Sequence, residues 1–181
     1  MADDRLTSGD WVNAGLKALA KSGFTALKAD TLSKVLGVSR GSFYWHFANV
    51  GAFHAAVLQH WREVAYDNVV REVEGTPESR LAALVERAFR ADVRLERAMR
   101  SWATADARAK AMVEAVDTWR LKYIRGLLVE TGLAANQASA RARILYWAYL
   151  GHGLSTTRPD PAEWQRILDE LVRLAATRKS G

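Results

Sequence analysis

The sequence contains no cysteine among its 181 residues. A disulfide framework, a thiolate metal site and a cysteine nucleophile are therefore excluded. Long apolar runs are also lacking, since none approaches the ~20 residues that a membrane-spanning helix needs. The opening Met-Ala-Asp-Asp does not resemble a secretory signal peptide. We therefore expect a cytoplasmic protein with no membrane partner.

Histidine is scarce, and the residues of this type are His46, His54, His60 and His152. No two of them are four residues apart, which is the spacing of a two-histidine zinc site on a helix. The sequence also lacks a glycine-rich phosphate loop, a nucleophile elbow and an identifiable pair of catalytic carboxylates. We therefore predict no catalytic residue, metal or cofactor, and no enzyme. His54 and His60 are expected at a surface or an interface.

Proline occurs only at positions 77, 159 and 161, and each coincides with a break in helical periodicity. No alternating pattern is long enough to predict a strand. The fold class is therefore predicted to be all-α with about nine helices. The expected helices span about residues 11–22, 28–36, 40–47, 49–74, 77–89, 95–103, 106–131, 136–153 and 162–176.

The segment 28–53 carries the most specific pattern in the chain. Leu32, Val35 and Leu36 recur at i, i+3 and i+4, which predicts one apolar stripe on a short helix. Gly37 follows the last periodic residue, where a left-handed glycine satisfies the final carbonyls and lets the chain turn. Val38 is expected to fill this turn from the inside.

A second short helix is predicted to begin at Arg40, with the Ser39 hydroxyl as its N-cap. Phe43 and Phe47 are four residues apart and are expected to face the core. Asn49 is a further N-cap candidate and begins the next helix. An ordinary helical hairpin with an aromatic core would also explain the spacing. The arc left exposed on the second helix consists of Arg40, Ser42, Tyr44, Trp45 and His46.

Together these residues resemble the DNA-binding domain of the tetracycline repressor (TetR) family over roughly residues 8–62. The matching positions are Gly23, Phe24, Ala26, Leu27, Leu32, Gly37, Val38, Ser39, Gly41, Ser42, Phe43, Tyr44, His46 and Phe47. The resemblance implies an N-terminal three-helix DNA-binding domain over residues 1–50, with its helix-turn-helix at about 28–47. Residues 51–181 would form a larger helical ligand-binding and dimerisation domain, linked by the helix from Asn49.

The function implied by the resemblance is that of a sequence-specific transcription regulator. We expect a homodimeric repressor that a small apolar or aromatic effector releases from a palindromic operator on double-stranded DNA. The residues predicted to contact DNA are Lys28, Thr31, Ser39, Arg40, Gly41, Ser42, Tyr44, Trp45, His46 and Asn49.

Three positions depart from the family pattern. Lys28 stands where a threonine is common, and its charge can still meet a phosphate. Asp30 occupies an often basic position, and a carboxylate there repels the DNA backbone and accepts only from a donor such as the cytosine amino group. Val50 replaces a usual phosphate-contacting lysine. Asp30 and Val50 favour an alternative, a helical small-molecule or protein-binding module whose helix-turn-helix no longer serves DNA.

The net charge of +6 does not by itself support DNA binding, because residues 1–75 hold eight basic and eight acidic side chains. The excess lies in residues 76–181, where solvated helix faces explain it more simply than a second DNA surface. The local balance is different. Between Trp11 and Asn49 the chain carries five Lys or Arg residues against Asp30 alone.

Large aromatic and methionine side chains gather in the later helices. Such residues line apolar ligand cavities, although they equally fill a plain core. The family resemblance implies an effector pocket in this region. The residues predicted to bind the effector are Met99, Trp102, Met112, Trp119, Tyr123, Tyr146, Trp147 and His152.

The last two predicted helices are rich in apolar residues, which indicates a buried seam. In the TetR family two such helices from each subunit form the dimer interface, and internal packing alone is the alternative. The residues predicted at this interface are Ile144, Leu150, Trp164, Ile167, Leu168 and Leu171.

Overall fold

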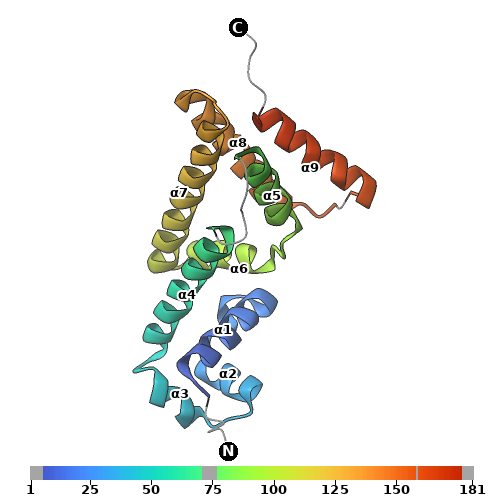
Figure 1. Cartoon of the computed structure of the whole chain (residues 1–181). Coiled ribbons are helices and arrows are strands. Elements are labelled where there is room, and N and C mark those ends of the chain that lie inside the picture. Colours follow the sequence, from blue (N-terminus) through green and yellow to red (C-terminus); the bar gives the residue numbers. More distant parts are fainter. Residues whose placement is uncertain (1–5, 71–76, 158, 177–181) are drawn as a thin grey trace, which may run out of the picture. The chain divides into compact units, whose positions relative to one another are not determined.

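The computed structural model describes residues 6–70, 77–157 and 159–176 (Figure 1). Within these residues it contains nine α-helices and one 3-10 turn, which confirms the all-α prediction. The elements are α1 (Ser8–Ser22), η1 (Phe24–Ala26), α2 (Ala29–Leu36), α3 (Arg40–His46), α4 (Val50–Val70), α5 (Pro77–Arg90), α6 (Arg94–Ala103), α7 (Ala107–Glu130), α8 (Ala135–Leu154) and α9 (Pro161–Ala176).

Side-chain caps explain where several helices begin. Thr7 and Asp10 form a reciprocal capping box at the start of α1, with the Thr7 backbone N–H donating to Asp10 over 2.7 Å. Asp106 accepts from the backbone N–H of Ala109 at 3.0 Å and opens α7, where the sequence predicted a helix start. Asp160 accepts from the N–H of Glu163 at 2.8 Å and opens α9 in the same way.

The chain divides into two compact units. The first comprises the described parts of residues 1–65 and 93–114, and the second those of 66–92 and 115–181. Helices α4 and α7 therefore each contribute residues to both units. The predicted division at residue 50, between a DNA-binding and a ligand-binding part, concerns function rather than compactness and stays a prediction.

Aromatic side chains form the core of the first unit, in which α1 packs against α6, η1 and α2. Trp11 and Phe43 are fully buried and meet edge to face, with ring centroids 5.3 Å apart. Trp102 is also buried and stacks on Phe24 at 4.7 Å. Burial of an aromatic side chain contributes roughly 1.5–3 kcal/mol, so these rings hold helices from distant parts of the sequence together.

In the second unit α5, α8 and α9 pack against one another (Figure 1). One buried cluster joins Leu81 of α5, Leu128 of α7 and Leu145 of α8. Another joins Val85 and Phe89 of α5 to Leu168 of α9. In the part of the chain that the structure describes, no helix is both long and apolar enough to span a membrane.

Candidate nucleic-acid interface

A left-handed glycine makes the turn between α2 and α3, as the sequence predicted. Gly37 has φ 69° and ψ 27°. The N–H of Val38 donates to the Ser33 carbonyl at 3.0 Å, and that of Gly37 donates to the Lys34 carbonyl at 3.4 Å. This pair of bonds is the Schellman pattern, which satisfies the last carbonyls of α2 and reverses the chain direction.

The predicted apolar stripe of α2 is wrong at one position. Val35 is 67% exposed, whereas Ala29, Leu32 and Ser33 are buried and Leu36 is half-buried. Positions 29, 32, 33 and 36 define one helical face, and Val35 lies about 110° from its centre at 100° per residue. Leu32, Val35 and Leu36 have the spacing of an apolar stripe, but this short helix buries a different face.

Ser39 occupies the N-cap position of α3 with extended backbone angles, φ −69° and ψ 151°. Its side chain makes no capping hydrogen bond, so the predicted side-chain cap is wrong. The first turn is closed instead by the N–H of Ser42, which donates to the Ser39 carbonyl at 3.1 Å. The exposed Ser39 hydroxyl is therefore not committed to starting the helix.

Two phenylalanines pack α3 against the core of the first unit, as predicted. Phe43 is fully buried, and its ring lies 5.3 Å from those of Phe47 and Phe53. Because α3 has only seven residues, burying this face directs the opposite arc outward. Trp45 is 89% exposed, and Tyr44 is exposed beside it.

None of the ten residues predicted to contact DNA is buried. Half-buried positions are Thr31, Ser42 and His46; exposed positions are Lys28, Ser39, Arg40, Gly41, Tyr44, Trp45 and Asn49. The half-buried state of His46 reflects its place beside Phe47, with ring centroids 6.4 Å apart. All ten are therefore at least partly accessible to solvent.

An ion pair that the sequence did not indicate joins the two motif helices. Arg40 Nε lies 3.1 Å from Asp30 Oδ1, and Arg40 Nη2 donates to the Tyr44 hydroxyl at 3.3 Å. The guanidinium also lies over the Tyr44 ring, 5.8 Å from its centroid. The Tyr44 hydrogen bond, and secondly the Asp30 charge, raise the pKa of Arg40 above its ordinary value.

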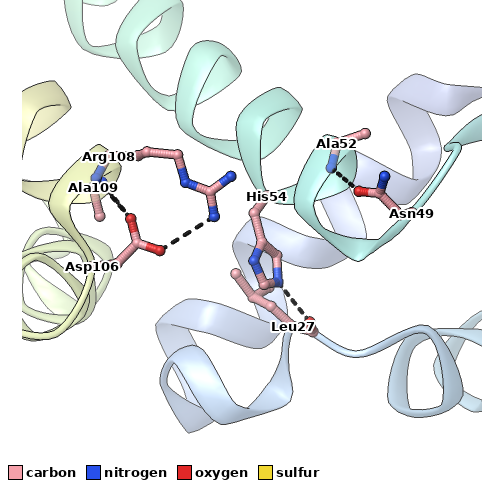
Figure 2. A network of polar contacts seen from close by, with 7 residues as sticks. All are labelled: Leu27, Asn49, Ala52, His54, Asp106, Arg108 and Ala109. Carbon is pink, nitrogen blue, oxygen red and sulfur yellow. Dashed lines mark hydrogen bonds and ion pairs between the residues drawn. The ribbon is translucent and has the colours of Figure 1, made fainter.

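Asn49 caps α4, as predicted, by accepting from the Ala52 N–H at 2.9 Å (Figure 2). Only its carboxamide oxygen is used in this bond, so the amide N–H groups can still donate to a phosphate. Val50, which replaces the lysine usual in the family, is half-buried at the first position of α4.

His54 is buried rather than at a surface or interface, so that prediction is wrong. Its Nε2 lies 2.9 Å from the Leu27 carbonyl oxygen, to which the ring N–H donates (Figure 2). The ring also meets Phe24 and Trp102 at centroid distances of 5.0 and 5.4 Å. The sequence pattern does not reveal this hydrogen bond, because its acceptor is a backbone carbonyl 27 residues away in the chain.

The eight predicted effector-binding residues are divided between the two units. Met99, Trp102 and Met112 belong to the first unit, where Met99 and Trp102 are part of the core. The other five, Trp119, Tyr123, Tyr146, Trp147 and His152, belong to the second unit.

Two aromatic groups stand out in that second unit. Trp119 stacks on Tyr66 at 4.5 Å and on Tyr123 at 5.4 Å. Tyr146 is buried and donates to Asp117 Oδ1 at 2.6 Å, and burial raises the pKa of its hydroxyl. These side chains present both flat apolar faces and polar atoms, the combination that small-molecule sites use.

The predicted dimer residues differ in exposure. Leu168 packs internally with Val85 and Phe89, whereas Ile144 is 60% exposed. Leu150, Trp164, Ile167 and Leu171 are half-buried. Further large apolar side chains are exposed on the same two helices, namely Trp147, Leu154 and Leu174.

Among residues 6–70, 77–157 and 159–176, no group of three or more His, Asp or Glu side chains is arranged to hold a metal ion.

A short outward-facing helix, fixed by a glycine turn and two buried phenylalanines, is the arrangement of a helix-turn-helix DNA-binding domain. Such a domain joined to a second helical unit defines a DNA-binding transcription regulator. The model for bacterial regulatory proteins of the tetR family matches residues 12–53. This segment is therefore similar to the DNA-binding domain of that family.

Solved structures extend the similarity of fold over nearly the whole chain. A transcriptional regulator from Rhodococcus sp. Rha1 is 19% identical, with 94% of each chain covered and a TM-score of 0.74. E. coli NemR in its reduced form is 18% identical, with 94% of this chain and 95% of that one covered and a TM-score of 0.70. The fatty acid degradation regulator FadR from Bacillus halodurans is 16% identical, with 96% of both chains covered and a TM-score of 0.67. No curated protein matches the chain significantly.

Proposed function

We propose that the chain acts as a homodimeric repressor that binds an inverted-repeat operator and is released by a small apolar or aromatic effector. The observation that carries DNA recognition is the exposed arc of α3, held outward by the buried Phe43 and Phe47. A major groove admits a helix of this kind, whose side chains then reach base edges.

The surrounding residues form two groups: some would position the protein on the DNA backbone, and others would contact bases. Lys28, Ser39 and Asn49 are exposed at the ends of α2, α3 and α4 and carry donors suited to phosphate oxygens. Arg40 and Trp45 project from α3, where hydrogen bonds and apolar contacts to base edges carry sequence information. This arrangement supports DNA recognition despite the acidic Asp30.

Dimerisation is proposed through the outer faces of α8 and α9. Ile144, Trp147 and Leu154 on α8 and Leu174 on α9 are each at least half exposed. Large apolar side chains left exposed on two helices favour an interaction surface there. A twofold dimer would cover the patch on both copies and match the symmetry of an inverted repeat.

The effector is proposed to bind in the second unit, beside Trp119, Tyr123, Tyr146 and His152. Stacked rings suit a flat apolar ligand, and the Tyr146 hydroxyl and the His152 ring supply polar contacts. The effector would relieve repression only by binding the released form more tightly than the DNA-bound form. Residues 1–50 would accordingly serve DNA, and residues 51–181 would serve the effector and the second copy.

Selection of bound fragments from random duplex DNA tests the proposal. Purified full-length protein should enrich one inverted repeat, and its affinity should fall steeply between two salt concentrations as counterions are released. Lys28→Ala should reduce the salt dependence by about one phosphate contact. Lys110→Ala is the matched control, because Lys110 is an exposed lysine of α7 that pairs with Glu114 at 3.9 Å.

The alternative, a binding module whose helix-turn-helix no longer serves DNA, gives a different result. Folded protein would then enrich no sequence, or Lys28→Ala and Lys110→Ala would weaken DNA binding equally. Either result would refute DNA recognition through the face around α3.

A further inference from the structure

The Arg40 guanidinium is held along one edge only. Its Nε contacts Asp30 Oδ1 at 3.1 Å and its Nη2 donates to the Tyr44 hydroxyl at 3.3 Å. A guanidinium carries five N–H donors in a rigid plane. The edge formed by Nη1 and the second hydrogen of Nη2 has no partner among the residues that the structure describes.

We propose that Asp30 is a positioning residue that fixes Arg40 to read a guanine through this free edge. Two parallel N–H groups match the O6 and N7 acceptors that guanine displays in the major groove. The inference rests on the proposed function and adds to it one base at one position of each operator half-site.

The charge of the pair explains why a carboxylate is useful beside DNA. An unpaired arginine at the start of α3 would be attracted to any nearby phosphate, which carries no sequence information. Asp30 neutralises Arg40 locally, so the pair contributes less to non-specific attraction. The guanidinium is then presented to acceptors that fit its geometry.

Fold stability does not account for the pair. Both side chains are 62% exposed, and exposed ion pairs contribute little to stability. The contacts instead fix the orientation of the Arg40 guanidinium. It pairs with Asp30 on α2, donates to the hydroxyl of Tyr44 one turn along α3, and lies over the Tyr44 ring. Three contacts thus restrict a long side chain that would otherwise sample many rotamers.

Base preferences of four proteins test this inference: wild type, Asp30→Asn, Asp30→Glu and Arg40→Ala. Wild type should prefer guanine at one position of each half-site, and Arg40→Ala should lose that preference. Asp30→Asn should reduce the same preference by about tenfold, as expected for one bidentate contact, while total affinity is kept or rises. Asp30→Glu keeps the charge and should restore part of the preference.

Glu114→Gln is the matched control, because it removes an exposed carboxylate of the same unit that belongs to α7 rather than to α2 or α3. It should leave every base preference unchanged. The midpoint of urea denaturation of each variant should equal that of wild type, which shows that the effect is not one of folding.

Two results would overturn the inference while leaving the proposed function intact. If Asp30→Asn alters the preference at a position different from that of Arg40→Ala, Asp30 reads a base itself. If it changes affinity evenly for all sequences, Asp30 acts only as a charge. Failure of wild type to enrich any DNA would instead refute the proposed function, and this inference with it.

Discussion

Gly15 lies in the middle of α1, where it permits close contact with α4, and its replacement by alanine tests the packing of the first unit. A Cβ at this position would lie 2.7 Å from Phe53 Cζ and 3.2 Å from Val57 Cγ2. The first distance is far inside van der Waals contact, so either the ring or the helix must move.

The structure indicates that the ring cannot move cheaply. Phe53 is fully buried, and its ring lies 5.3 Å from that of Phe43 and 5.1 Å from that of Phe47. Overpacking a filled core costs about 1–3 kcal/mol, whereas alanine gains about 1 kcal/mol over glycine in a helix interior. We therefore expect Gly15→Ala to lower the free energy of unfolding by about 1 kcal/mol.

Urea denaturation followed by circular dichroism and tryptophan fluorescence measures this change. Gly126→Ala is the matched control, because Gly126 lies inside α7 and a Cβ there would meet nothing within 4 Å. It should stabilise the protein by up to about 1 kcal/mol. Adding Phe53→Leu to Gly15→Ala should cost less than the sum of the two single changes. A Gly15→Ala variant at least as stable as wild type would refute the packing argument.

Burial raises the pKa of the Tyr146 hydroxyl in the folded protein. Because the unfolded chain loses the hydroxyl proton at a lower pH, the free energy of unfolding should fall as pH rises above about 10, by at most about 1.4 kcal/mol per pH unit. Tyr146→Phe should remove this component from urea midpoints measured between pH 9 and 11; parallel curves for the two proteins would contradict it. Asn49→Ala removes the cap on the Ala52 N–H and should cost about 1 kcal/mol of stability, while Asn49→Asp should not. Trp147→Glu should convert the proposed dimer to a monomer in sedimentation, whereas Val129→Glu, which changes another exposed apolar residue, should leave the proposed dimer intact. If Trp147→Glu still sediments as a dimer, this face is not the interface.

The helical architecture could be predicted from sequence because its determinants are local. The infrequent prolines leave long periodic segments, and Gly37 turns where a left-handed residue is needed. The spacing of Phe43 and Phe47 was enough to predict which arc of α3 faces outward. Val35 is the exception, since a helix of eight residues accommodates more than one apolar stripe.

Contacts between distant residues could not be predicted in this way. Trp102 stacks on Phe24 from another part of the sequence, and composition gives no means of separating such a core residue from a pocket residue. His54 bonds to a backbone carbonyl, which every residue possesses. The ion pair of Asp30 and Arg40 depends on the angle between two helices, which the Gly37 turn sets but the residue pattern does not reveal.

The position of α3 depends on the core, because this helix is too short to be stable alone. It has seven residues, and isolated helices below about 12–15 residues are marginal in water. Its orientation therefore comes from Phe43, which contacts Trp11 and Phe53, and Phe53 is the ring that a side chain at Gly15 would displace. A change such as Gly15→Ala should thus alter operator affinity without touching DNA. Changes to exposed residues such as Trp45 should alter base preference at nearly constant stability, because those side chains bury little surface in the free protein.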